Sequence, residues 1–454
     1  MPRSDLRAKS VESPLYVYTA IDRRLVWVGT LNLDDSSGEV PRPILADFRY
    51  APSYLASPAA YPLDPINLPL RDEVFRTTSR FHVLGALFDA APDAWGRSVI
   101  RADNAGLMPS EREVFVRGRG LGVGSLLFAP QMLDEAVDLA SLPQASAHVA
   151  GFEEIQTVEA VLATIDEGGQ VDDAWRDLLA SSWDIGGARP KTIVRDQAGE
   201  LWIAKFPRAR DSFDRQRVEW ANLEMARDIG MDVPQAQLIE GRFGAVLLVH
   251  RFDRAVEGQG TSRRHYLSAA SLISPSPSFD KRDMDRPQGV ATFSYARVAD
   301  VIKRISSSPA RDLQELYARM VLNVAIHNTD DHLKNTGFLK HEDGRTGRYR
   351  LSPLFDVVTQ EGSAKHMLHI GPVGRESSFD NALAGAARMS IKPKAAQEII
   401  GRVQDVTSRR HDYYARAGLT DREIEVIDRC MSAWHLLEDF EEDPDHVPAA
   451  RPRG

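Results

Sequence analysis

The sequence has little of what marks several common protein classes. It contains one cysteine, Cys430, which excludes an internal disulfide framework and a zinc site built from several cysteines. Its longest plain apolar run, near residues 245–249, is far shorter than the roughly 20 residues that cross a bilayer. The first ten residues are charged and lead into no apolar run, so no signal peptide is expected. These absences predict a cytoplasmic protein with no membrane partner, in a reducing compartment.

An excess of positive charge is also missing. The formal net charge is −9, which excludes nucleic-acid binding through the overall charge of the chain and leaves only a local basic patch for it. The 43% hydrophobic and 27% charged residues are ordinary for a soluble globular protein. A length of 454 residues is enough for two or three domains with large cores.

Local patterns predict an α+β protein in three parts. Two strands around a turn are expected over residues 14–32, a helical segment punctuated by Pro92 to Arg97 over residues 75–99, and a linker over the Ala-, Ser- and Asp-rich residues 129–150. From Tyr295 onward the chain is expected to be mostly helical. The predicted domains are an N-terminal α/β domain, a strand-rich small lobe and a helical large lobe, over residues 1–150, 151–255 and 256–454.

A dense polar run follows one of the apolar helical patterns. In it, Asp330 stands five residues before Asn335, and Lys334 lies between them. Phosphoryl transfer needs such a set, because a carboxylate takes the proton of the attacking hydroxyl, an amide oxygen holds a hard cation, and a lysine offsets charge on the phosphate. Taken alone, the run is equally compatible with a polar loop that caps a helix.

A pair of glycines, Gly186-Gly187, precedes two predicted strands of a hairpin, residues 192–194 and 201–206. Dinucleotide-binding loops and P-loops open a helix instead, so the pattern argues against both. A glycine-rich turn between strands can lay its backbone over phosphates. For two glycines alone, a plain tight turn is the simpler interpretation.

Lys205 lies on the second strand of that hairpin, on the same face as Leu201 and Ile203. A lysine on an apolar face needs a partner, and Glu219 on the next predicted helix can supply one. A strand lysine paired to a helix glutamate is how protein kinases hold the α- and β-phosphates of ATP. A lysine that extends its amine to the surface is the common alternative.

Two further segments complete a collinear order. His250 to Phe252 end a strand where a kinase places the hinge between its lobes, and Asp356 follows an apolar pair where it can share a metal ion with Asn335. The order is glycine turn, strand lysine, helix glutamate, hinge, Asp-x4-Asn loop and second aspartate, which is the protein-kinase order. This conjunction is far more specific than any of its members. It predicts a bilobal, protein-kinase-like fold with a strand-rich small lobe and a mostly helical large lobe.

On these residues the chain resembles the HipA family, the serine/threonine kinases that are toxins of bacterial type II toxin–antitoxin modules. The resemblance extends over roughly residues 14–435. It includes Pro92 to Arg97 and Gly124 to Phe128, which are similar to the N-terminal subdomain of the family. The segments that carry it most clearly are Gly186 to Lys191, Asn328 to Asn335 with Gly337-Phe338, and Leu351 to Asp356.

The resemblance implies a role for each matching residue. Asp330 is the expected catalytic base, His332 and Lys334 complete the catalytic loop, and Asn335 and Asp356 are the expected ligands of Mg²⁺. The residues expected to bind ATP are Gly186, Gly187, Ala188, Arg189 and Lys191 in the glycine turn, Lys205 with its partner Glu219, and His250 and Phe252 in the hinge. The implied partners are a helix-turn-helix antitoxin (HipB-like), operator DNA reached through that antitoxin, and a protein substrate such as an aminoacyl-tRNA synthetase or another translation protein.

One position departs from the family pattern. Family members often carry a serine two residues before the glycine pair, and its phosphorylation silences the kinase, whereas this chain has Asp184 there. An aspartate carries about one negative charge, against roughly −1.5 to −2 for a phosphoserine. Regulation therefore moves to Ser181 or Ser182, just upstream, or the loop switch is absent. A less active kinase is a further alternative.

Two other functions stay open at this point. A small-molecule kinase of the aminoglycoside or choline type uses a similar Asp-x4-Asn loop, although the glycine turn with Arg189-Pro190-Lys191 and the N-terminal domain argue against it. The other is a weakly active or inactive kinase-fold co-regulator of transcription. It ranks lower, because no metal or nucleotide residue is lost from the sequence.

Overall fold

The computed structural model describes residues 14–21, 24–33, 46–77, 84–104, 106–118, 120–133, 149–169, 182, 187–257, 260–274, 284–341 and 348–441. The strands are β1 Leu15–Ile21, β2 Arg24–Leu33, β3 Ala46–Tyr50, β4 Val74–Arg76, β5 Leu126–Ala129, β6 Ala150–Gly151, β7 Lys191–Arg195, β8 Leu201–Lys205, β9 Ala236–Glu240, β10 Ala245–His250, β11 Arg254–Glu257, β12 Gly260–Arg263, β13 Tyr266–Ser268, β14 Gly337–Lys340 and β15 Tyr349–Leu351.

The α-helices in these residues are α1 Pro52–Leu55, α2 Gly85–Asp89, α3 Ala94–Asp103, α4 Glu111–Arg117, α5 Ile155–Asp166, α7 Arg215–Ile229, α8 Ala269–Ile273, α9 Pro287–Thr292, α10 Tyr295–Ile305, α11 Pro309–Ala325, α12 Phe379–Gly385, α13 Pro393–Thr407, α14 Arg410–Arg416 and α15 Asp421–Glu441. Short 3-10 turns are η2 Phe152–Glu154, η6 Leu333–Asn335 and η7 Ala386–Met389. The mixture of sheets and helices confirms the predicted α+β class.

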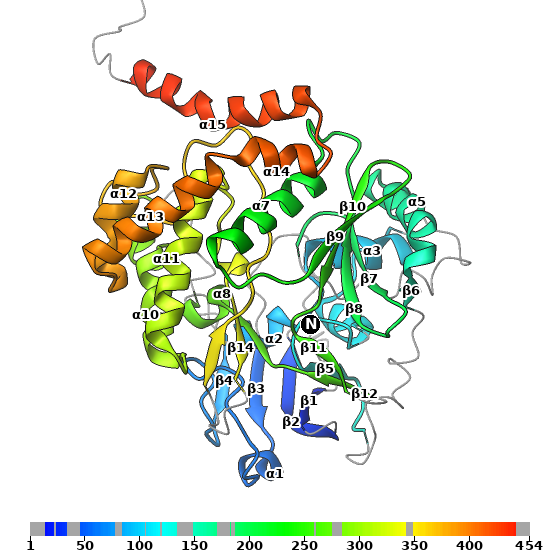
Figure 1. The fold of residues 1–454 in the computed structure, drawn as a ribbon. Coiled ribbons are helices and arrows are strands. Elements are labelled where there is room, and N and C mark those ends of the chain that lie inside the picture. Colours follow the sequence, from blue (N-terminus) through cyan, green and yellow to red (C-terminus); the bar gives the residue numbers. More distant parts are fainter. Residues whose placement is uncertain are drawn as a thin grey trace, which may run out of the picture.

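The N-terminal part forms a five-stranded antiparallel sheet in the order β4-β3-β2-β1-β5, drawn in blue and cyan in Figure 1. Strands β1 and β2 confirm the strand pair predicted over residues 14–32. The punctuated helical segment predicted over residues 75–99 is confirmed by α2 and α3 but is wrong at its start. Phe75 lies in β4 opposite Phe48 and its ring packs against Tyr50, so sheet pairing overrides the helical pattern. The helices α2 and α3 lie on either side of Pro92. The proline ring disfavours helical backbone in the residue before it, so the two helices are separate.

The small lobe is a second five-stranded sheet in the order β6-β7-β8-β10-β9, covered by α7. Strands β7 and β8 are antiparallel neighbours joined by a turn, which confirms the predicted hairpin. Helix α7 begins where the Asp214 carboxylate accepts the N–H groups of Gln216 and Arg217. It ends at Gly230, whose φ of 94° is the left-handed cap that glycine adopts without strain.

In the large lobe α11 packs against both α10 and α13, and α13 also packs against α7 (Figure 1). Helix α11 is seventeen residues long and buries one face along its whole length. The polar run follows directly and leads into β14, the central strand of the sheet β13-β14-β15. A buried helix and a buried strand therefore hold the two ends of the polar run in fixed positions.

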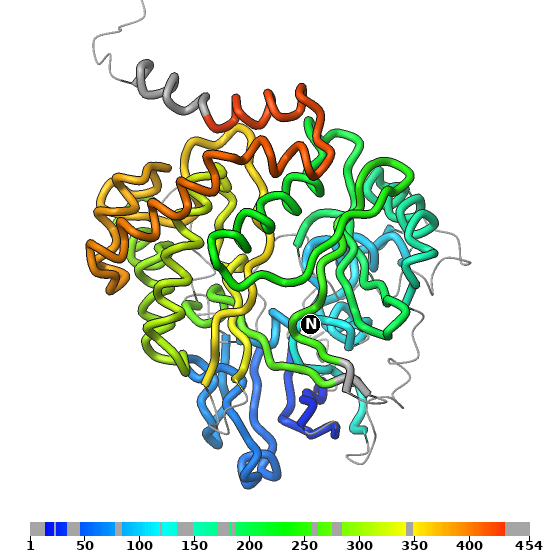
Figure 2. Tube along the Cα trace, viewed as in Figure 1, coloured from blue at the N-terminus to red at the C-terminus, as the bar shows by residue number. Residues whose placement is uncertain are grey.

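Helix α3 belongs by sequence to the N-terminal part but packs in the core of the small lobe. Its residues Trp95, Val99 and Ile100 are buried in one apolar cluster with α5, β8 and β10. Figure 2 traces this cyan helix beside the green strands of the small lobe. The sequence patterns do not predict this packing. The predicted boundary near residue 150 stays a prediction, and most of the expected linker, residues 134–148, lies outside the described residues.

A buried charge cluster joins the hinge to the glycine-rich segment before β5. One oxygen of Asp253, Oδ2, accepts hydrogen bonds from Gly124 N, Arg251 Nη2 and Arg254 Nη1 at 2.7, 2.8 and 2.8 Å. The two guanidinium groups also donate to the carbonyl oxygen of Gly122. All three charged side chains are at most 4% exposed. Burial acts to raise the pKa of Asp253, but Arg251 and Arg254 outweigh it and hold this pKa far below its ordinary value.

Within the described ranges, none of the helices combines the length and the apolar character needed to cross a membrane.

We predict that Asp253→Ala destabilises the fold by about 3–5 kcal/mol, because it removes a buried carboxylate that two buried guanidinium groups share. The measurement is the denaturant midpoint of unfolding, followed by circular dichroism. The matched control is Asp72→Ala, which breaks an ion pair with Arg49 whose side chains are 61% and 55% exposed, and should cost less than about 1 kcal/mol. Equal midpoints for the two variants would contradict the prediction.

Candidate active site

Three charged side chains from separate segments meet at the centre of the site. Lys205 on β8 donates to Oε1 and Oε2 of Glu219 on α7 at 2.6 and 2.9 Å, and to Oδ1 of Asp356 at 3.1 Å. The N–H of Asp356 donates to Glu219 Oε1 at 3.1 Å. Burial lowers the pKa of Lys205, but Glu219 and Asp356 outweigh it and raise the pKa well above its ordinary value. The lysine therefore stays charged and links the small lobe to the large lobe.

Asp356 adopts a backbone conformation that is rare for its residue type. Its φ is 61°, in the left-handed region, which costs a non-glycine residue about 1–3 kcal/mol. The contacts with Lys205 and Glu219 hold it there. Lys205 holds the pKa of this carboxyl far below its ordinary value, against the effect of burial. An ionised carboxylate in a strained, fixed position is suited to bind a cation.

A second lysine stands directly across the hairpin from the first. Lys191 on β7 pairs with Lys205 on β8 in the strand register. Two like charges opposite each other destabilise a sheet unless an anion lies between or beside them. Burial and the neighbouring Lys205 lower the pKa of Lys191 to about 8. The pair marks this end of the hairpin as a place for an anion with several charges.

The glycine turn leads into this lysine pair. Gly187 has a φ of 96°, a backbone conformation that glycine adopts without strain and other residues rarely adopt. Ala188 is exposed, and its carbonyl oxygen accepts from Arg208 at 2.7 Å. Arg189 is paired with Asp211. Gly186, Ser181 and Asp184, which the sequence also marked, lie outside the described residues.

Ser182 is described by the structure and is fully buried. Its hydroxyl donates to Thr192 Oγ1 at 2.7 Å. A kinase active site cannot reach a hydroxyl in this state, so phosphorylation of Ser182 requires this segment to open first.

The catalytic-loop candidates lie between α11 and β14. Asp330 is exposed, and the side-chain amide of Asn335 donates to its carbonyl oxygen at 2.9 Å, which leaves Asn335 Oδ1 as the atom for a cation. Partial burial raises the pKa of Asp330 above its ordinary value; His332 opposes this shift and Asp356 adds to it. His332 Nδ1 is shielded from solvent and has no hydrogen-bond partner among the described residues. A raised carboxyl pKa suits a group that accepts a proton.

Asp331, the next residue, has a structural role that the sequence did not indicate. Its carboxylate accepts from Tyr295 Oη at 2.7 Å and from Met367 N at 2.8 Å, and lies 3.0 Å from His366 Nδ1. His366 Nε2 lies 2.9 Å from Ser377 Oγ. The connectivity is that of a hydrolase triad, but Ser377 is only 2% exposed and no substrate can reach it. The network instead anchors the catalytic loop to the segment that follows Asp356.

The two hinge candidates, His250 and Phe252, contact different parts of the structure. The ring of His250 packs against Trp202, with centroids 5.0 Å apart, and Nε2 lies 3.3 Å from Glu200 Oε2. Phe252 instead packs against Phe355, the residue before Asp356, with centroids 5.8 Å apart. Phe252 is thus connected to the metal-ligand candidate, while the side chain of His250 is engaged with the β7–β8 hairpin. That either residue binds adenine stays a prediction.

Sequence reasoning missed three residues at this site. Arg215, in the first turn of α7, donates to Gln360 at 3.1 Å, and its charge acts to lower the pKa of Asp330. Asp93 contacts Lys334, and Trp95 contacts the glycine turn. The segment Pro92 to Arg97 was marked only as similar to a family motif, and no local pattern indicates that it meets residues from both lobes.

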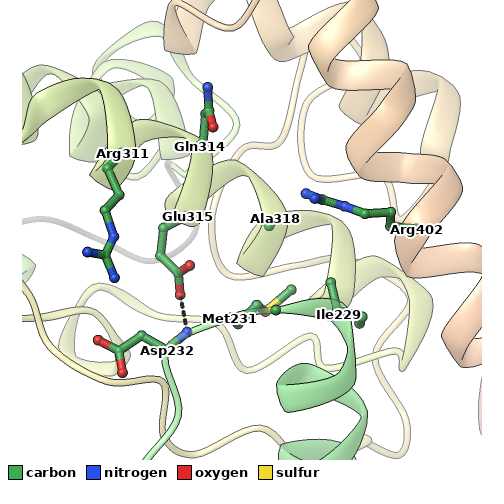
Figure 3. A pocket seen from close by; sticks show the side chains of 9 residues that line it. Ile229, Met231, Asp232, Arg311, Gln314, Glu315, Ala318 and Arg402 are labelled. Atoms are coloured by element: carbon green, nitrogen blue, oxygen red, sulfur yellow. Dashed lines mark hydrogen bonds between the residues drawn. The ribbon is translucent and has the colours of Figure 1, made fainter.

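A cavity of about 360 Å³ lies elsewhere, between the end of α7, α11 and α13 (Figure 3). Its lining carries both signs of charge, with Asp232 and Glu315 against Arg311 and Arg402. Glu315 is already engaged, since it accepts from the N–H of Asp232 at 3.2 Å and pairs with Arg319. None of the candidate catalytic, nucleotide or metal residues lines this cavity, so it is separate from the candidate active site.

The site residues fit a nucleotide with a hard cation. Asn335 and Asp356 offer oxygen ligands only, and Mg²⁺ typically takes one or two such ligands and completes its shell with phosphate oxygens and water. In the described part of the chain, no group of three or more His, Cys, Asp or Glu residues could hold a metal alone. The facing lysines match the phosphates, and the partnerless His332 nitrogen is available for a polar ligand.

Comparison with known proteins places this geometry in a family. Residues 183–410, half of the chain, match the model of the HipA-like C-terminal domain. Two Sinorhizobium fredii proteins, provisionally named kinases, are similar in sequence. Y4dM is 31% identical over 182 residues, 37% of this chain and 39% of its own length, and Y4mE is 24% identical over 311 residues, 61% of this chain and 68% of its own length.

A solved structure is similar over nearly the whole chain. It is HipA of Shewanella oneidensis MR-1, determined in a complex with HipB and its operator DNA. The TM-score is 0.62 at 16% identity, and the match covers 92% of this chain and 95% of that one. At this identity the likeness shows the fold, which is the bilobal, kinase-like fold predicted from the sequence. The chain therefore belongs to the HipA family, whose C-terminal domain it carries.

Proposed function

We propose that this protein is an ATP-dependent serine/threonine protein kinase, the toxin of a HipBA-type toxin–antitoxin module. The single observation that carries the proposal is the set formed by Lys205, Glu219 and Asp356, with Asp330 and Asn335 on the adjoining loop. These residue types on these elements are the parts that phosphoryl transfer by kinases requires.

Each residue has a distinct task in the proposed reaction. Lys191 and Lys205 bind the phosphates of ATP, and Asn335 and Asp356 hold Mg²⁺, which neutralises charge on the transferred group. Asp330 accepts the proton of a serine or threonine hydroxyl. As it does so, the hydroxyl oxygen bonds to the γ-phosphorus and ADP leaves. Lys334 offsets charge on the phosphoryl group in transit.

The biological role rests on the family. The solved relative from Shewanella oneidensis was determined with HipB and operator DNA, so we propose a helix-turn-helix antitoxin as partner here, with operator DNA reached through it. The proposed substrate is a translation-related protein such as an aminoacyl-tRNA synthetase, whose phosphorylation would arrest growth. Such a substrate and partner place the protein in the cytoplasm.

The decisive experiment is phosphotransfer. Wild-type protein incubated with Mg²⁺, ATP and a cell lysate should phosphorylate one or a few proteins on serine or threonine, identified by mass spectrometry. Asp330→Ala and Asp356→Ala should each lower the rate by about 10³-fold or more, because each loses the proton acceptor or a cation ligand of the transition state. Asp72→Ala, far from the site in an exposed ion pair, is the control. Near wild-type rates in the two variants would contradict the assignment, and phosphate found only on small molecules would favour a small-molecule kinase.

A second prediction concerns pH. In the nucleotide-free protein the pKa of Lys191 is about 8, below the usual value for lysine, so the side chain becomes neutral as the pH rises through 8. Bound phosphates favour the charged form, so ATP binding takes up a proton above that pH. The dissociation constant for Mg-ATP should therefore rise between pH 8 and 9.5, approaching tenfold per pH unit. Calorimetric titration measures it, and Lys191→Met should bind more weakly without this slope. A flat wild-type profile would refute the assigned role.

A third prediction concerns the loop before the glycine turn. Asp184 is not phosphorylated as a serine is, so wild-type protein after incubation with Mg-ATP should carry no phosphate at position 184. Any loop phosphate should lie on Ser181 or Ser182, and the buried state of Ser182 makes its modification depend on opening of the segment. Asp184→Ser should create a new site. Phosphopeptide mapping of wild type, Ser181→Ala/Ser182→Ala and Asp184→Ser tests this. Abundant phosphate that survives loss of both serines and maps outside residues 180–192 would contradict it.

A further inference from the structure

The motif Pro92 to Arg97 has no task in the proposed reaction, yet it is tightly built. Asp93 Oδ1 accepts the N–H of Ala94 at 2.9 Å and begins α3. The Arg97 guanidinium donates to the carbonyl oxygen of Pro92 at 3.2 Å and holds both oxygens of Glu111 at 2.6 and 2.7 Å. These bonds fix the turn before α3 and so fix the direction of the Asp93 side chain.

The second oxygen of Asp93 is directed at the active site. Oδ2 accepts from Lys334 Nζ at 2.9 Å, although the two residues are 241 positions apart. The N–H of Gly187 points to the same oxygen at a longer 3.4 Å. Helix capping uses Oδ1 alone and explains neither contact. Asp93 therefore touches the glycine turn of the small lobe and the catalytic loop of the large lobe at once.

Trp95 reinforces this connection from the same turn of helix. Its N–H donates to the carbonyl oxygen of Gly187 at 2.8 Å, and its indole Nε1 donates to the carbonyl oxygen of Lys191 at 2.9 Å. The ring is 2% exposed in the small-lobe core. Both ends of the segment from Gly187 to Lys191 are thus fixed to α3, so α3 is a rigid base from which Asp93 reaches Lys334.

We propose that Asp93 is a positioning residue for phosphoryl transfer: it holds the Lys334 amine in one position and fastens the glycine turn to the catalytic loop. This inference rests on the proposed kinase function. Lysine has a long, flexible side chain, and at Lys334 the side chain is 54% exposed. Restricting it before ATP binds removes part of the ordering that the transition state would otherwise require.

The same contact is too weak to act as a brake. The Asp93 side chain is 34% exposed, and an ion pair that is open to solvent on both sides shifts an equilibrium by no more than about fivefold. The phosphates of ATP carry more negative charge than the Asp93 carboxylate, so Lys334 would leave Asp93 and bind the phosphates. Asp93 can therefore set where the amine starts, but it cannot keep the amine from the phosphate.

The test is Asp93→Asn, which retains a side-chain oxygen to cap α3 but removes the charge that holds Lys334. We expect kcat for phosphotransfer to fall roughly 3- to 5-fold, with the ADP dissociation constant and the Tm within the range of the control, because ADP lacks the γ-phosphate that Lys334 serves. The control is Asp103→Asn, which removes the same charge at the far end of α3, where Asp103 pairs with Arg117. It should leave kcat unchanged.

A double-variant comparison separates positioning from simple support of the fold. In a Lys334→Met background, Asp93→Asn should change kcat by less than about twofold, because the group that it positions is gone. An equal loss of kcat in the wild-type and Lys334→Met backgrounds would overturn the proposal. A rise in kcat would also overturn it, as would a lower Tm together with a weaker ADP affinity in Asp93→Asn alone.

Amide hydrogen exchange gives a readout that does not depend on activity. In the nucleotide-free protein, Asp93→Asn should speed exchange in peptides that contain Gly187 to Lys191 and Leu333 to Asn335, and Asp103→Asn should not. Unchanged exchange in both segments would overturn the proposal. If wild-type protein shows no phosphotransfer at all, the proposed function fails, while the exchange data still show whether Asp93 fastens the two segments.

Discussion

The charge of Lys205 is the constraint on which the rest of the site depends. An ammonium group at the edge of an apolar core is stable only with close counter-charges, and Glu219 and Asp356 supply them from α7 and from the large lobe. To do so, α7 must pack against the small-lobe sheet, and Asp356 must accept a left-handed backbone. One ion cluster thus fixes the distance between the lobes and prepares a carboxylate for a cation.

The cluster brings two lysines and two acids together in a largely buried site. Lys191 faces Lys205 across the hairpin, while the carboxylates of Glu219 and Asp356 are already engaged by Lys205. Burial and the like charge of Lys205 lower the pKa of Lys191 to about 8, and the carboxylates of Asp356 and Glu219 only partly oppose this shift. A polyphosphate beside the two lysines would favour the charged form of Lys191, and a cation on Asp356 would weaken the contact of Asp356 with Lys205. The two lysines and the two acids therefore fit nucleotide and metal together better than either alone.

Features set by neighbouring residues could be predicted, and features set by distant ones could not. The β7–β8 hairpin, the cap at Gly230 and the Lys205–Glu219 pair follow from alternation, glycine and short spacing, and all are present. The helical segment predicted over residues 75–99 is wrong at its start because Phe75 joins a strand whose partner is not its sequence neighbour. Asp93 reaches Lys334 across 241 residues, a contact that no local pattern encodes.

The position of α3 determines how the N-terminal part relates to the kinase lobes. Trp95, Val99 and Ile100 fill the small-lobe core, so removing them would open a cavity beside β8, the strand that carries Lys205. The Asp253 cluster joins the same part of the chain to the hinge through buried charges. Two independent sets of contacts therefore make the N-terminal residues part of the active site's support. A change in how they pack would reach the glycine turn through Gly187 and the catalytic loop through Lys334, without any change in the catalytic residues themselves.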